Sequence, residues 1–250
     1  MKLKFKSGIG TGIVLVLAYG LFLVCYAPAR LLTAVPLPAG MAIAEAAGTV
    51  WQGSLQRFRW RTLMLDDVHW NTTFSDFMPA LEIAFKKPEG IAGSGIIRGW
   101  QQPQFYQWQL SVPASYLFSH MRFIVPIGAE GNVQLNLQEA TVDRSGCQSL
   151  DANITWQGAR VKTPLGGLVL ATPQATLRCQ QGALEASLRQ NSSHLQLSGK
   201  GSVTPKGEYR FTGRLSSGND LPATMKKLLA TTGKADEQGV RTLNFQGRLL

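Results

Sequence analysis

The sequence predicts a mainly β protein, with an N-terminal transmembrane helix followed by a curved, largely antiparallel multi-stranded β-sheet domain and one or two short helices. Three observations lead to this prediction: an uncharged apolar run near the N-terminus, a period-two alternation of apolar residues beyond residue 40, and 26 glycines. Alternating runs separated by turn residues are typical of antiparallel strands with one solvated face. A chain of 250 residues with 44% hydrophobic and 16% charged content has the composition of a globular protein with a sizeable core.

The N-terminal apolar run extends from Ser7 to Ala27 and contains 21 residues without a charge. As a helix it would be roughly 30 Å long, which matches the hydrocarbon core of a bilayer. Three basic residues precede the run: Lys2, Lys4 and Lys6. By the positive-inside rule they place the N-terminus in the cytoplasm and the rest of the chain on the far side of the membrane.

A cleaved signal peptide is the alternative interpretation of this run, because residues 27–29, Ala-Pro-Ala, resemble a cleavage site. The run is longer than the usual apolar region of a signal peptide, so the sequence favours an uncleaved anchor. The predicted organisation has a cytoplasmic N-terminus at 1–6, a signal-anchor helix at 7–27, a Pro-containing connector at 28–47 and an exported β-rich domain at 48–250.

The exported domain is expected to contain around a dozen short strands. The predicted strands are 63–70, interrupted at Asp66-Asp67, and then 80–85, 104–110, 132–138, 149–156, 167–172, 174–179, 183–189, 194–201, 208–215 and 241–250. Short helices are predicted at 113–121, which begins with proline, and at 219–233, where Pro222 suits the first turn and Gly233 the end.

Cys147 and Cys179 lie in the exported part, where an oxidising compartment favours a structural disulfide. No CxxC or Cys/His pattern predicts a metal site, and Cys25 falls inside the apolar run. The net charge of +10 leaves about +7 after removal of the three N-terminal lysines. No run of five basic residues predicts nucleic-acid binding, so the positive surface suits anionic lipid headgroups or acidic protein partners.

The sequence does not predict an enzyme. It contains no nucleophile elbow, phosphate-binding loop or zinc-protease motif, and "GSGIIRG" at 93–99 does not fit a dinucleotide fingerprint. His69, His120 and His194 stand in unrelated contexts without an acidic partner nearby in sequence. The pair Asp66-Asp67 predicts a turn or bulge, because adjacent strand residues point to opposite faces. No catalytic residue, cofactor or metal is therefore expected.

The stretch "GTVWQGS" at 48–54 predicts the entry to the sheet, and a strand through 57–61 is expected to follow it. Gly48 and Gly53 suit positions that need a positive φ or a close backbone approach, and Trp51 is expected to pack over the start of the sheet. Six tryptophans, at positions 51, 60, 70, 100, 108 and 156, are open to two interpretations, a packed core or an aromatic groove for lipid or carbohydrate.

These elements together resemble the type II secretion system protein N family. The resemblance rests on the Lys-flanked anchor, the Pro-containing exit, "GTVWQGS" with Gly48, Trp51 and Gly53, and "LMLDDVHW" ending at Trp70. The Cys147/Cys179 pair and the closing "GVRTLNFQGRL" also fit, and the resemblance covers essentially the whole chain. The opening motif is also similar to exported segments of AsmA-like β-rich proteins.

The resemblance implies a non-enzymatic, single-pass component of a bacterial inner membrane with its bulk in the periplasm. Such a component would help to export folded proteins and would contact other secretion components or the exported proteins. The alternative is a membrane-anchored periplasmic module that binds or transfers a lipid or glycolipid in an apolar β trough. An apolar face left uncovered by a helix or second sheet would favour the alternative, and a filled core would exclude it.

Overall fold

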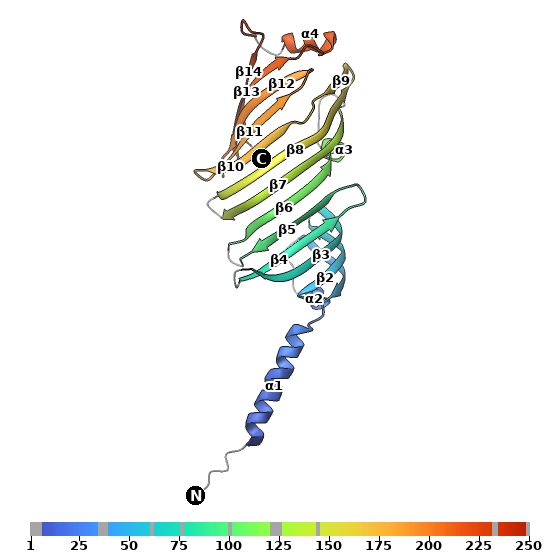
Figure 1. Ribbon diagram of the computed structural model, residues 1–250, viewed down its shortest axis with the longest axis vertical. Helices are drawn as coiled ribbons and strands as arrows, with labels where there is room; N and C mark the ends of the chain where they lie inside the picture. Colours follow the sequence, from blue (N-terminus) through green and yellow to red (C-terminus); the bar gives the residue numbers. More distant parts are fainter. Residues whose placement is uncertain are drawn as a thin grey trace. The chain divides into compact units, whose positions relative to one another are not determined.

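The computed structural model describes residues 7–34, 40–60, 63–75, 78–99, 102–120, 127–143, 146–231 and 235–248. This part of the chain contains fourteen strands and four helices (Figure 1). They form two compact units, Met1–Thr73 and Phe74–Leu250. Lys2, Lys4, Lys6 and Trp100 lie outside the described residues.

The first unit consists of an apolar helix and an antiparallel meander. Its elements are α1 (Ser7–Cys25), α2 (Leu31–Ala34), β1 (Met41–Gly48), β2 (Gln52–Trp60) and β3 (Leu63–Ser75). β2 pairs with β1 on one side and with β3 on the other. Five apolar residues from the three strands and the loop after α1 are buried: Ala29, Ala46, Leu55, Val68 and Trp70.

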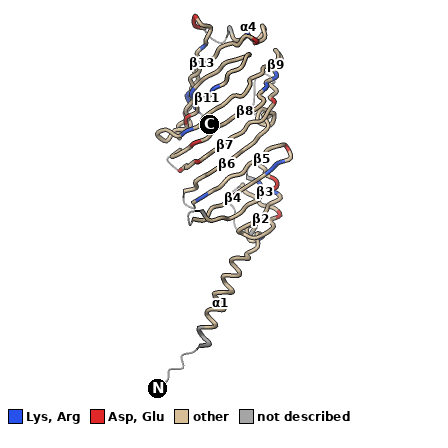
Figure 2. The backbone as a smooth tube through the Cα atoms, viewed as in Figure 1, with Lys and Arg blue, Asp and Glu red and all other residues tan. Residues whose placement is uncertain are grey.

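Helix α1 carries no charged residue (Figure 2). Its side chains are described from Thr11 to Cys25, and the large apolar ones in that range are more than half exposed. Among the residues that the structure describes, no helix has both the length and the apolar character required to cross a membrane.

The second unit is an antiparallel sheet whose strand order mostly follows the chain. Its strands are β4 (Met78–Lys86), β5 (Ala92–Arg98), β6 (Gln104–Pro113), β7 (Gly128–Asp143), β8 (Gly146–Thr163), β9 (Gly166–Val169), β10 (Gln174–Gln180), β11 (Ala183–Asn191), β12 (Leu195–Val203), β13 (Glu208–Ser217) and β14 (Arg241–Arg248). Each strand pairs with the next, except that β8 pairs with both β9 and β10 (Figure 1). Two short helices, α3 (Ala114–Ser119) and α4 (Ala223–Thr231), complete the unit.

The predicted mainly β, antiparallel fold with few short helices is confirmed, and each predicted strand overlaps a strand of the structure, although the one predicted at 167–172 ends at Val169 and residues 249–250 lie outside the described residues. Two strands were not predicted. β1 occupies the end of the predicted connector at 28–47, and β5 contains the glycine-rich segment considered as a nucleotide fingerprint. At Asp67 the backbone has a φ of 52°, so the interruption predicted at Asp66-Asp67 is an irregularity inside the continuous strand β3.

The strand register separates the second unit into a polar and an apolar face, because residues paired across antiparallel strands lie on the same face. One polar row crosses six strands through Thr155, Gln174, Arg189, Ser198, Arg214 and Thr242. The adjacent apolar row contains Ile154, Ala175, Leu188, Gly199, Gly213 and Leu243. The first row contains only polar residues, and the second contains only apolar residues and glycine. The alternation expected from the sequence is therefore present in the sheet.

Aromatic rings on the apolar face occupy the space beside glycines of neighbouring strands. A Cβ added to Gly93 would collide with the Phe85 ring, and one added to Gly95 would collide with the Trp108 ring. Phe211 covers Gly199 in the same way. A glycine at each of these positions leaves room for the ring, so the aromatic side chain buries part of its surface against the backbone. These pairs explain how a sheet with one apolar face packs its largest side chains.

Candidate functional site

The turn at Gly48–Gly53 joins the first hairpin to the end of helix α1. The Val50 amide donates to the Ala27 carbonyl oxygen (2.9 Å), and the Trp51 indole Nε1 donates to the Val24 carbonyl oxygen (2.7 Å). The last carbonyl groups of a helix have no partner inside the helix. Here the turn supplies donors to one of these carbonyls and to the residue just beyond the helix, so it fixes the helix end to the sheet.

Gly48, Gly53 and Trp70 support this turn. Gly48 has a φ of +92°, a conformation that favours glycine, and it pairs with Gly53 across β1 and β2. Gly53 in turn pairs with Trp70, whose ring covers it, and the Trp70 Nε1 donates to the Val50 carbonyl oxygen (3.1 Å). The four motif residues therefore meet in one cluster beside the helix end, with Trp51 40% exposed and Trp70 9% exposed.

The substitution Trp51→Phe is expected to loosen this junction. It would keep an aromatic ring at this position but remove the hydrogen bond to Val24, with a cost of about 1 kcal/mol and about fivefold faster local opening. Hydrogen exchange at the Val50 amide, which is bonded to Ala27, measures that opening. The matched control is Tyr19→Phe, which removes an exposed hydroxyl of α1; equal exchange rates in the two variants would contradict the capping role of Trp51.

Cys147 and Cys179 form the predicted disulfide, with Cα atoms 5.6 Å apart. Cys147 lies near the start of β8, and Cys179 lies near the end of β10. The two strands are paired nearby, where Asp151 faces Arg178. The bond thus closes the end of the sheet segment formed by β8, β9 and β10. Cys25 is a free, exposed cysteine of α1.

The histidines do not assemble into a reactive centre in the described part of the chain. His69 Nε2 lies 2.8 Å from Asp67 Oδ1, so the expectation that no acidic partner stands nearby in sequence is wrong for this residue. Both side chains are more than half exposed. His120 contacts Tyr116 in α3, and the His194 ring nitrogen accepts from the Val169 amide. No group of three metal-ligating side chains comes together among the described residues.

Four of the tryptophans donate hydrogen bonds to backbone carbonyls. Trp108 Nε1 donates to Ile96 (3.1 Å) and Trp156 Nε1 donates to Glu130 (3.0 Å), as Trp51 and Trp70 do in the first unit. Trp156 also stacks against Phe118 of α3, with ring centroids 5.5 Å apart. Their polar atoms are thus satisfied within the protein, which supports packing over an aromatic ligand groove for these residues.

The carboxylate of Glu130 is paired with basic side chains of the neighbouring strand. The Lys162 ammonium on β8 donates to the Glu130 carboxylate on β7 and holds the pKa of that carboxyl below its usual range. Arg160, 4.0 Å away, adds to the effect, and desolvation opposes it. Because the pKa is lowered in the folded protein, the stabilisation from this pair is present at neutral pH and is lost as the pH falls through the lowered pKa.

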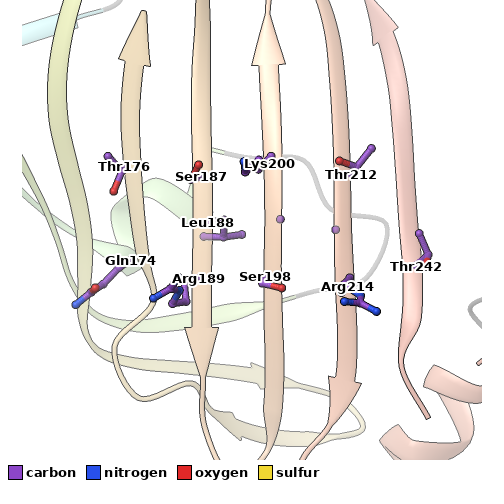
Figure 3. Close-up of a pocket in the computed structure, with 12 residues that line it drawn as sticks. Gln174, Thr176, Ser187, Leu188, Arg189, Ser198, Lys200, Thr212, Arg214 and Thr242 are labelled. Carbon is purple, nitrogen blue, oxygen red and sulfur yellow. The ribbon is translucent and has the colours of Figure 1, made fainter. Parts of the chain in front are cut away.

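A shallow groove of about 750 Å³ opens on the polar face of β10–β14. Its basic residues, Arg189, Lys200 and Arg214, come from three successive strands (Figure 3). Hydroxyl and amide side chains line most of the remainder, together with Leu188, Gly199 and Gly213: Gln174, Thr176, Ser187, Ser198, Thr212 and Thr242. The sequence did not predict this site, because its three basic residues are 25 positions apart from first to last and become neighbours only through the strand register.

The apolar face of the second unit is incompletely covered. Large side chains at its centre are half-buried: Leu135, Leu137, Ile154, Leu177, Leu197 and Phe211. No large side chain among the described residues is fully buried, and several of the buried apolar residues are alanines. The described strands do not form a second sheet over this face.

The fold and these sites define a class of β-sheet protein with two features. An apolar N-terminal helix is fixed to the first hairpin, and a broad antiparallel sheet has one polar face and one incompletely covered apolar face. Comparison with known proteins identifies the family. Residues 39–244 match the family model described as "Type II secretion system (T2SS), protein N". The chain therefore belongs to the type II secretion system protein N family.

Three relatives carry the same description, "Type II secretion system protein N". The one from Pectobacterium carotovorum subsp. carotovorum is 90% identical over 248 residues, covering 99% of this chain and 100% of the relative. The one from Klebsiella pneumoniae is 34% identical, with 98% of each chain covered. The one from Aeromonas hydrophila is 32% identical, with 93% of this chain and 95% of the relative covered. No solved structure matches the chain significantly. Membership of this family supports a role in type II secretion.

Proposed function

We propose that this chain is a non-enzymatic inner-membrane component of the type II secretion system that helps to export folded proteins from the periplasm across the outer membrane. The observation that carries the proposal is the junction at Gly48–Gly53, which joins an exposed apolar helix to a β-sheet unit. A helix fixed in this way to folded structure suits a permanent anchor. The uncharged run 7–27 behind Lys2, Lys4 and Lys6 supports a single membrane pass with residues 1–6 in the cytoplasm.

The sheet surfaces are the proposed contacts with other secretion components or exported proteins. Among the described strands β14 pairs with β13 alone, and apart from a bridge between Arg241 and Ala235 its second edge presents backbone groups of the kind to which strands of a partner add. The sheet begins at Met41, so the proposed periplasmic part includes β1 in addition to residues 48–250.

Deletion of the gene tests the secretion role. We expect lower levels of secreted protein outside the cell and accumulation of the same protein in the periplasm, with recovery when the full chain is restored. A chain whose residues 1–27 are replaced by a cleavable signal peptide is expected to recover secretion poorly, because it lacks the anchor. Unchanged secretion in the deletion strain would contradict the proposed role, and full recovery by the anchorless chain would contradict the anchor.

Lipid or glycolipid binding is a second candidate function, and the incompletely covered apolar face of the second unit favours it. Acyl chains laid across half-buried leucines would remove apolar surface from water. A photo-crosslinking residue at Leu177 or Leu197 on this face tests the idea, with Thr176 and Ser198 on the polar face as matched controls. Lipid adducts only at the two leucine positions would support it. Adducts at neither face, or equally at both, would count against it.

A further inference from the structure

The groove on the polar face of β10–β14 contains a basic triad, Arg189, Lys200 and Arg214. All three side chains are exposed. The register pairs Arg189 with Ser198, and Ser198 with Arg214, so the two arginines flank one serine across three strands (Figure 3). Lys200 lies two residues from Ser198 on the middle strand, on the same face. Lys200 in turn is paired with Ser187 and Thr212, so basic and hydroxyl side chains alternate across the three strands.

The charges of the triad are not balanced by acids in the groove. None of its three residues forms a salt bridge with a carboxylate in the described part of the chain, and the groove lining there contains no Asp or Glu. Two other basic residues of the second unit differ. Lys162 pairs with Glu130, and Arg178 faces Asp151 and Glu185 in the neighbouring strands. The triad is thus a local positive surface without an internal partner.

The spacing of the triad indicates what it can hold. Arg189 and Arg214 are separated by two strand spacings, about 10 Å at the backbone. In an extended peptide of polyproline II conformation, which has three residues per turn, side chains three residues apart lie on one side and are about 9 Å apart. Two carboxylates of one such segment can therefore each meet an arginine. Guanidinium groups bind carboxylates through paired, charge-assisted hydrogen bonds.

The rest of the lining agrees with a peptide. The hydroxyl groups of Thr176, Ser187, Ser198 and Thr212 can donate to and accept from a peptide backbone. The described lining has no aromatic side chain, so it provides no ring on which a sugar or nucleobase could stack. We propose that this groove binds an extended acidic segment of a protein partner, with its carboxylates paired to the basic triad.

Fluorescence anisotropy with the full chain in non-ionic detergent tests this site. The probe is a labelled synthetic peptide with glutamate at every third position among serines, and its comparison has glutamine at those positions. We expect the glutamate peptide to bind more tightly at low salt and to lose affinity as salt rises. The triple variant R189Q/K200Q/R214Q should bind it about tenfold more weakly, since each exposed ion pair contributes modestly.

The matched control, R57Q/R59Q/K86Q, removes the same charge from exposed positions on β2 and β4. Retained affinity in this control, with loss in the triad variant, supports the site. Equal loss in both variants would overturn it, because net charge alone would then explain binding. Triad-dependent binding of inorganic phosphate or phosphatidylglycerol vesicles, without binding of the peptide, would overturn the peptide assignment. The site extends the secretion role proposed above, yet its binding is measured without secretion, so failure of one is distinguishable from failure of the other.

Discussion

Loss of the Cys147–Cys179 disulfide is expected to lower the free energy of unfolding of the second unit by about 3.5–4 kcal/mol in the loop-entropy model. The two cysteines are separated by 32 positions, and the closed loop contains most of β8, all of β9 and most of β10. In the unfolded chain the bond restricts this whole segment. Its removal therefore stabilises the unfolded state more than it disturbs the native pairing of Asp151 with Arg178.

The double variant C147S/C179S is the form to measure, because a single substitution would leave a reactive thiol. Urea unfolding should show a lower midpoint with a similar slope, and the wild-type chain under reducing conditions should move toward the variant. Cys25→Ser is the control, since this cysteine is free and exposed on α1. A double variant that unfolds at the wild-type midpoint would show that the bond contributes nothing to stability.

Most strands could be predicted because their side chains alternate, and the two that were missed lack the residues that mark strands. β1 reads Met-Ala-Ile-Ala-Glu-Ala-Ala-Gly, and alanine has little preference for strands. Its pairing with β2 compensates for that weak local preference. β5 contains Gly93 and Gly95, which appear as a loop in sequence. In the structure the rings of Phe85 and Trp108 cover these glycines, so contacts from neighbouring strands supply what the segment itself lacks.

The candidate sites also differ in how far the sequence alone could indicate them. The cluster at Gly48–Gly53 was indicated locally, because two glycines and a tryptophan in six residues suggest a tight, packed turn. Its bonds to Val24 and Ala27 depend on the folded unit and could not be predicted from spacing. The basic triad was missed for a related reason. The sequence shows its members scattered, whereas cross-strand pairing adds a neighbour at every strand and gathers residues that hairpins have separated.

Replacement of Gly53 by valine is expected to destabilise the first unit by about 3 kcal/mol, at the upper end for inserting atoms into a packed site. A Cβ at this position would collide with the Ala47 carbonyl oxygen and would lie 2.5 Å from the Trp70 ring. The ring cannot stay in place, and its movement would break the Nε1 hydrogen bond to Val50. Because Val50 also holds Ala27, the damage should reach the end of helix α1.

The matched control is Gly167→Val in β9, where an added Cβ meets no atom closer than 4.0 Å. Both changes place the same β-branched residue in a strand, so a difference between them reports the crowding at Gly53 and not strand preference. Limited proteolysis of the full chain should cut the first unit of G53V faster than that of the control, and Trp fluorescence should report the displaced Trp70. Equal protection of the two variants would mean that Trp70 can leave Gly53 without cost, and the junction would then not depend on this pair.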